Sequence, residues 1–152
     1  MVRLISVVGA AECSEEEAQT AEEVGRLLAE RGFGVVCGGL GGVMRATCKG
    51  CKRAGGQTVG ILPGDDPNDA NPWVEIPIPT GMGEARNVLV AKAGEAMVAV
   101  GGEYGTLSEI AFALKLGKTV VAIGKWSNLE GVTPADSATN AVDLAIKALN
   151  AN

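Results

Sequence analysis

The chain has 152 residues, of which 47% are apolar, and it carries a formal net charge of −5 without any histidine. This length and composition suit one globular domain of about 150 residues with enough apolar material for a core. The lack of histidine excludes Ser-His-Asp and Cys-His nucleophile systems and the HExxH zinc site. The negative charge and the 3% of aromatic residues disfavour nucleic-acid and anionic-membrane surfaces.

The apolar residues form short strand-like runs that alternate with helical periods. The first strand is expected at Arg3–Gly9, and the next helix from a Ser14 cap to about Arg31, with Glu17 at capping-box spacing. Further strands are expected at 34–37, 58–62, 96–100 and 119–123, with a short apolar segment at 73–78. Further helices are expected from the turn at 38–42 through 54, and at 80–93, 106–116 and 137–149.

This alternation is typical of βαβ units and predicts an α/β fold: a doubly wound, mostly parallel, Rossmann-like sheet in three αβα layers. Neither a linker nor a repeat interrupts it, so residues 1–152 are expected to form a single domain. No apolar run reaches the roughly 20 residues that span a bilayer. The apolar start of the chain runs into acidic residues without a cleavage site. We therefore expect a cytoplasmic protein that contacts neither membranes nor nucleic acid.

Two glycine clusters, at 38–42 and 101–105, each follow an expected strand and precede a helix. Right-handed crossovers bring both clusters to the carboxyl edge of the sheet, where ligands bind in such folds. Glycine lets the backbone approach a ligand closely, and a helix N-terminus offers free N–H groups to an anion. Gly102, Gly105 and Thr106 are therefore expected to cradle a phosphate.

Glu109 and Arg86 are the candidate catalytic residues. A carboxylate in the first turn of a helix, facing a bound phosphate, would have a raised pKa, which suits a general acid or a group that holds ribose hydroxyls. The alternative for Glu109 is a capping box with Thr106. Arg86 lies at the start of the preceding helix, where a cation opposes the helix dipole and indicates an anionic partner. The alternative is an exposed arginine paired with Glu84 or with another neighbour.

Arg86 and Glu109 are 23 positions apart, which corresponds to one helix plus one strand, so both are expected at the same sheet edge. Two further loops are expected to offer backbone contacts there. One begins at Gly9, and the other contains Gly39, Gly41 and Gly42.

All four cysteines are expected to be reduced and to serve as ordinary small residues. Cys48 and Cys51 form a lone CxxC pair, and a structural zinc site needs a second pair of ligands. No metal site is therefore expected.

Four motifs resemble those of the LOG-like Rossmann superfamily and occur in the family's order over about residues 1–125. They are GGLGGVM at 38–44, GILPG at 60–64, GEARN at 83–87 and GxYGTLxE at 102–109. Within the superfamily, the sequence is similar to the small branch that contains the molybdenum cofactor carrier proteins. The resemblance adds Met44 to the candidate ligand-binding residues and implies a homo-oligomer.

The resemblance implies two alternative functions for the same sheet edge. Well-known members are phosphoribohydrolases that release the base from cytokinin nucleoside 5′-monophosphates. For them the loop at 102–106 would hold the phosphate, Arg86 and Glu109 match the catalytic positions, and no cofactor is required. The other function is a non-catalytic carrier or sensor of a nucleotide or of molybdenum cofactor. The older label of lysine decarboxylase does not fit, because nothing in the sequence indicates a pyridoxal phosphate site.

The sequence departs from the hydrolase motif PGGxGTxxE and from its upstream arginine motif. Gly101 replaces the proline, Glu103 replaces the second glycine, and Asn87 replaces the lysine after the arginine. A Glu103 carboxylate that pointed into the loop would repel phosphate. Hydrolysis and carriage therefore both remain open.

Overall fold

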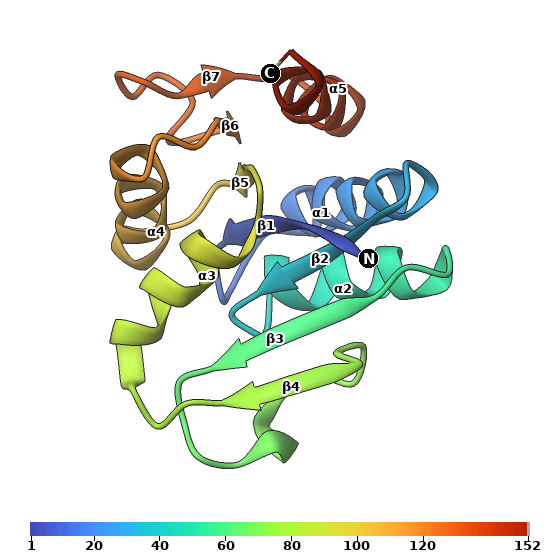
Figure 1. Cartoon of the computed structure of the whole chain (residues 1–152), viewed down its shortest axis with the longest axis vertical. Coiled ribbons are helices and arrows are strands. Elements are labelled where there is room, and N and C mark those ends of the chain that lie inside the picture. The colour runs from blue at the N-terminus through green and yellow to red at the C-terminus, as the bar shows by residue number, and fades with distance from the viewer. Residues whose placement is uncertain (152) are drawn as a thin grey trace.

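The protein is described by a computed structural model in which residues 1–151 are placed (Figure 1). Seven strands form one sheet in the order β4-β3-β2-β1-β5-β6-β7, and every neighbouring pair is parallel. The strands are β1 (Arg3–Gly9), β2 (Phe33–Cys37), β3 (Thr58–Leu62), β4 (Ile76–Pro79), β5 (Met97–Val100), β6 (Val120–Ile123) and β7 (Thr133–Pro134). The expected parallel, doubly wound sheet is confirmed.

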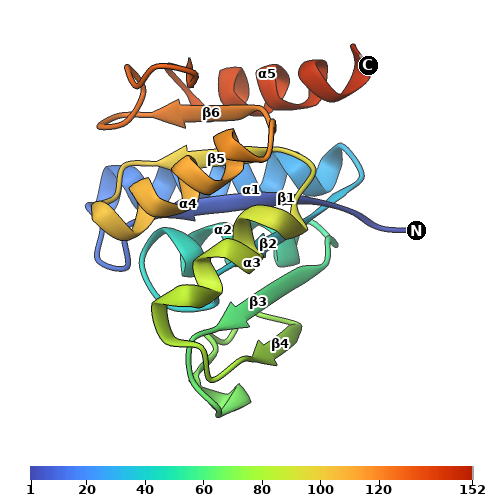
Figure 2. The same ribbon diagram turned by 60° about the vertical axis from the view of Figure 1, so that its left-hand side comes forward.

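Helices cover both faces of the sheet, as Figures 1 and 2 show, which gives the three αβα layers. The α-helices are α1 (Glu15–Glu30), α2 (Val43–Arg53), α3 (Asn87–Ala93), α4 (Tyr104–Lys115) and α5 (Ala138–Asn150), and the 3₁₀ turns are η1 (Pro67–Asp69) and η2 (Gly83–Arg86). Helices α1, α2 and α5 pack on one face and α3 and α4 on the other. None of the helices in residues 1–151 has the length and apolar character needed to cross a membrane.

Strands β2 and β5, which flank β1, are apolar along their whole length because both of their faces are covered. Every residue of β2 and of β5 is buried. Local signals also place the helix ends: Ser14 and Glu17 form the expected capping box at the start of α1.

Four details differ from the sequence expectations. Helix α4 begins at Tyr104 after an N-cap residue, Glu103, whose side chain makes no capping bond, so the Thr106–Glu109 capping box is not formed. The expected helix at 80–93 is divided into η2 and α3. The apolar segment at 73–78 is a strand only from Ile76 onward, and the two-residue strand β7 was not expected.

The order of the sheet reverses between β1 and β5. Strands β2 to β4 lie on one side of β1, and β5 to β7 lie on the other. The loops that leave the carboxyl ends of β1 and β5 therefore diverge to opposite faces and leave a crevice between them, which is where ligands bind in open α/β sheets.

Candidate functional site

A cleft of about 460 Å³ lies at this switch point. Its size is within the range of sites for small molecules. It is lined by residues that follow β1 and β2 and by the starts of α2, α3 and α4: Gly9, Ala10, Ala11, Glu12, Leu40, Met44, Glu84, Arg86, Asn87, Glu103, Gly105, Thr106 and Glu109. Arg86 and Glu109, which were expected at one sheet edge, do line the same cleft.

Arg86 is held rigidly at the floor of the cleft. Its Nε donates to Ile61 O at 2.9 Å and its Nη2 to Gly38 O at 3.5 Å, both at the carboxyl edge of the sheet. The side chain is buried, so the alternative of an exposed arginine paired with Glu84 is wrong. Carbonyl oxygens do not neutralise a guanidinium charge, so the buried cation is available to an anion in the cleft.

Asn87 connects Arg86 to helix α4. Its Oδ1 accepts a hydrogen bond from Arg86 Nη1, and its Nδ2 donates to Ser108 Oγ at 3.2 Å. Ser108 Oγ in turn donates to Gly105 O at 2.6 Å. The amide thus fixes the guanidinium relative to the start of α4.

The start of α4 supplies a second group of donors. The first residues of a helix have N–H groups without intrahelical acceptors, and they carry the positive end of the helix dipole. Gly105 and Thr106 are in this first turn, and both line the cleft. Behind them, Gly102 has a φ of 100° and lies so close to Thr106 that a Cβ there would be 2.2 Å from Thr106 Oγ1. A glycine is required at this position for backbone and packing reasons.

Glu109 is buried, with 8% of its surface exposed, and faces the same cleft. It lies in the second turn of α4, not in the first as the sequence suggested. Burial raises the pKa of this carboxyl to about 8, against the opposing effect of the Arg86 charge, and Glu84 adds a further rise. No side-chain hydrogen bond of Glu109 occurs within residues 1–151. At pH 7 the group is therefore mainly a neutral acid that can donate or accept a hydrogen bond.

Three further carboxylates, Glu12, Glu84 and Glu103, line the exposed parts of the cleft. Glu103 forms an ion pair of 2.7 Å with Lys125, which follows β6. This pairing turns the carboxylate toward a cation beside the loop at 102–106 and reduces its repulsion of an anion. The other two remain available to hydrogen-bond donors on a ligand.

The candidate glycines fall into two groups. Gly9 and Gly105 line the cleft, as Met44 does, whereas Gly39, Gly41, Gly42 and Gly102 are not among its lining residues. Gly39 packs on β3, where a Cβ would lie 2.7 Å from Leu62 Cδ2, and Gly42 packs against Ala10 O. The tight contacts of this second group are with the protein itself.

Sequence reasoning missed Glu12, Glu84 and Asn87 as cleft residues. Asn87 had a usable signal, because it directly follows Arg86 at a position where the related motif has lysine. Glu12 lies in the loop that begins at Gly9, which was expected at this edge, but only for its backbone contacts.

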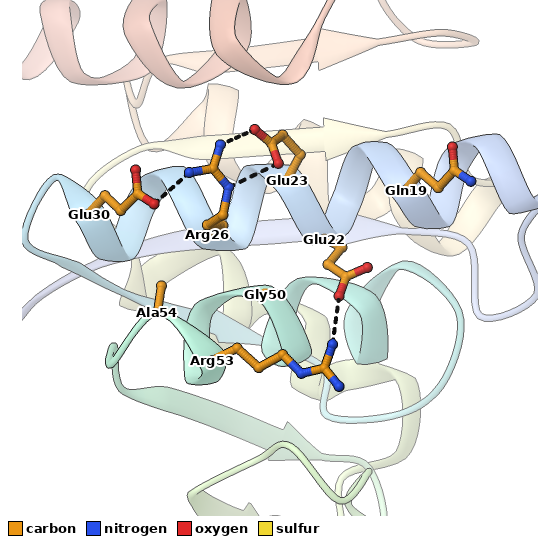
Figure 3. A pocket seen from close by; sticks show the side chains of 8 residues that line it. All are labelled: Gln19, Glu22, Glu23, Arg26, Glu30, Gly50, Arg53 and Ala54. Atoms are coloured by element: carbon orange, nitrogen blue, oxygen red, sulfur yellow. Dashed lines mark hydrogen bonds and ion pairs between the residues drawn. The ribbon is translucent and has the colours of Figure 1, made fainter.

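A second depression of about 380 Å³ lies between α1 and α2 on the outer surface (Figure 3). Its charged side chains pair with one another: Arg26 contacts Glu23 and Glu30, and Arg53 contacts Glu22. Exposed ion pairs of this kind contribute little to the stability of a fold. The depression is far from the carboxyl edge of the sheet and offers no unpaired cation or buried polar group, so the switch-point cleft is the better candidate.

Comparison with known proteins connects this chain to a family. The sequence pattern of the SLOG cluster4 family matches residues 2–148. An uncharacterized protein of Archaeoglobus fulgidus is 45% identical over 142 residues, which is 93% of each chain. The molybdenum cofactor binding protein of the phototrophic bacterium Rippkaea orientalis has a TM-score of 0.90 at 33% identity, over 99% of this chain and 98% of that one. The molybdenum cofactor carrier protein of Chlamydomonas reinhardtii has a TM-score of 0.87 at 35% identity, over 100% of both chains.

Proposed function

Because the chain belongs to the SLOG cluster4 family, we propose that its cleft binds a phosphate-bearing small molecule without turning it over, and that this ligand is molybdenum cofactor. The observation that carries the proposal is the pairing of one buried, rigidly held cation, Arg86, with the free N–H groups at the start of α4. Together they form a site for one anionic group. The likeness to the carrier and binding proteins over nearly the whole chain supports the identity of the ligand.

The remaining lining suits the rest of such a ligand. Molybdenum cofactor is a pterin that carries a phosphate group, and a pterin ring presents N–H donors along its edge. Glu12 and Glu84 offer carboxylate acceptors at the exposed side of the cleft, and the neutral Glu109 offers both a donor and an acceptor within it. A ligand with several phosphates would instead meet more negative than positive charge.

Binding is tested with purified protein and molybdenum cofactor released anaerobically from a molybdoenzyme, followed by gel filtration to separate bound from free cofactor. Gly105→Val projects a side chain into the cleft, since a Cβ at Gly105 has no neighbour closer than 3.9 Å. We expect this variant to fold and to lose at least about tenfold in affinity, which is about 1.4 kcal/mol. Ala111→Val, on an exposed position of the same helix, is the matched control and keeps wild-type affinity. Equal binding by both variants would place the cofactor elsewhere.

Hydrolysis of a nucleoside 5′-monophosphate is the second candidate, and Glu109 is the observation that favours it. A carboxyl with a pKa of about 8 holds its proton near neutral pH, as a general acid for a departing base must. We would incubate the protein with a panel of nucleoside 5′-monophosphates and detect free base by chromatography, with Glu109→Gln as the control. Release of base that the substitution abolishes would replace the carrier proposal with a phosphoribohydrolase. Binding without release supports carriage.

A further inference from the structure

Cys37 and Cys48 form a buried thiol pair next to the cleft. Cys37 is the last residue of β2, Cys48 lies within α2, and their Sγ atoms are 3.5 Å apart. Neither side chain is exposed. They form a small cluster with Met44, which itself lines the cleft.

The CxxC spacing does not identify this pair. Cys51, the sequence neighbour of Cys48, donates its thiol to Gln57 O at 3.4 Å, and burial raises its pKa to about 11. The close partner of Cys48 is Cys37, which is brought there by the packing of α2 on the sheet. The sequence, from which all four cysteines were expected to be ordinary small residues, gave no sign of the Cys37–Cys48 pair.

The surroundings of Cys37 favour its thiolate. Gly39 N–H donates to Cys37 Sγ at 3.3 Å. The hydrogen bond shared with the Cys48 thiol lowers the pKa of Cys37 and raises that of Cys48. A thiolate is the nucleophile in thiol oxidation, so Cys37 is the sulfur that reacts first.

We propose that Cys37 and Cys48 are a redox-modification site, which a peroxide converts into a disulfide between the end of β2 and helix α2. The Cys37 thiolate attacks one oxygen of hydrogen peroxide and the O–O bond breaks. Cys37 becomes a sulfenic acid, and the departing hydroxide takes a proton from solvent and leaves as the first water. The Cys48 thiol then attacks Cys37 Sγ and its proton passes to the departing hydroxyl group, so that the S–S bond forms and the second water leaves. The two thiols are oxidised together, and one peroxide is reduced to two waters.

The geometry requires only a small adjustment. A disulfide bond is about 2.05 Å long, so the two sulfurs must approach by about 1.5 Å. The change reaches the cleft through two neighbours in the chain and in space. Gly38, which directly follows Cys37, supplies a carbonyl to Arg86. Met44 packs in the same small cluster as Cys37 and Cys48. Formation of the disulfide therefore acts next to Gly38, whose carbonyl holds the Arg86 guanidinium of the proposed binding site.

Peptide mapping tests the site without any ligand. The native protein is treated with hydrogen peroxide, remaining thiols are alkylated with iodoacetamide under denaturing conditions, and the protein is digested without reductant. We expect a linked peptide that contains Cys37 and Cys48, lighter by two hydrogen atoms than the two reduced peptides, and recovery of the reduced peptides after treatment with dithiothreitol. Cys13, which is partly exposed, and Cys51 should stay alkylated as single thiols.

Three variants distinguish this pair from its alternatives. Cys51→Ser should keep the linked peptide, whereas Cys37→Ser and Cys48→Ser should each abolish it. A Cys48–Cys51 link, or oxidation to sulfinic and sulfonic acids without any link, would overturn the proposal. The mapping of the wild-type protein decides between these outcomes even if a serine variant fails to fold. Failure of cofactor binding would leave this result unchanged, because the test measures only the sulfurs.

Discussion

Glu109 shows at the scale of one residue how a group in the candidate site opposes stability. A carboxyl group that is buried without a hydrogen-bond partner loses hydration, and the nearby Arg86 charge offsets only part of that loss. It responds by holding its proton, which is the physical origin of its pKa of about 8. Arg86, in contrast, is buried with three acceptors arranged around it, so its charge is kept in place for an anion.

The raised pKa of Glu109 makes stability depend on pH. Between its unfolded value of 4.5 and about 8, the folded protein binds a proton that the unfolded chain releases, so the free energy of unfolding falls as pH rises across this window. Each pKa unit corresponds to about 1.4 kcal/mol. Glu109→Gln removes this term, so we expect it to raise Tm at pH 9, by about 2–4 °C for each kcal/mol recovered. At pH 5 wild type and variant should unfold at similar temperatures.

Thermal melts of both proteins between pH 5 and pH 9 measure the effect. Glu103→Gln is a suitable control, because Glu103 is exposed and paired with Lys125 at the rim of the same cleft. A Glu109→Gln curve that runs parallel to that of the wild type would contradict the assigned pKa.

At the scale of elements, α1 and α2 meet through glycines. A Cβ at Gly25 would lie 2.0 Å from Thr47 O, and a Cβ at Gly50 would lie 1.9 Å from Glu22 O. The two backbones touch and hold α2 against α1, and Met44, in the first turn of α2, lines the cleft. The surface depression in Figure 3 is the outer side of this crossing.

The crossing reverses the usual effect of glycine in a helix. Replacing a helical glycine by alanine normally stabilises a helix by about 1 kcal/mol. Gly50→Ala instead places a methyl group against backbone atoms that cannot move aside, so we expect a loss of about 2 kcal/mol or more. Urea unfolding of the two proteins measures it. Gly105→Ala, where a Cβ has open space, serves as the matched control and should not lower stability.

At the scale of the whole molecule, one cleft is assembled from segments that are distant in sequence. The loop after β1, the start of α3 and the start of α4 meet because β1 and β5 are neighbours at the switch point. Helix α5 packs with α1 on the sheet face opposite to α3 and α4, and it does not line the cleft. A bound ligand therefore contacts three segments that are distant in the sequence, two of which the Asn87–Ser108 hydrogen bond already connects.

Amide hydrogen exchange tests this arrangement. With molybdenum cofactor bound, we expect slower exchange in three separate segments, at about residues 9–12, 84–87 and 102–107, because a ligand that bridges them suppresses their local opening. The exchange rates of amides in α5 should not change on binding, because this helix does not line the cleft. Protection confined to the groove between α1 and α2 would indicate that the ligand binds at the depression in Figure 3 instead.

The amino-acid sequence by itself determined the kind and order of most elements, because apolar periodicity and capping residues act within a few residues of each other. It also determined the family, since the motifs that resemble the LOG-like superfamily are short and local, and the match to the SLOG cluster4 family confirms this. The arrangement of Arg86 and Glu109 at one edge followed from their spacing along an alternating βα pattern.

Only the tertiary structure decided which groups these residues meet. The carbonyls that hold Arg86 come from Gly38 and Ile61, and the partner of Cys48 is Cys37 rather than its neighbour in the CxxC motif. The capping box expected at Thr106 is missing because α4 begins at Tyr104, two residues before the expected start, with Glu103 as its N-cap residue. Glu109 then lies in the second turn, where its side chain is buried and lines the cleft. Local patterns report the preferences of a segment, whereas these contacts depend on how separate segments pack together.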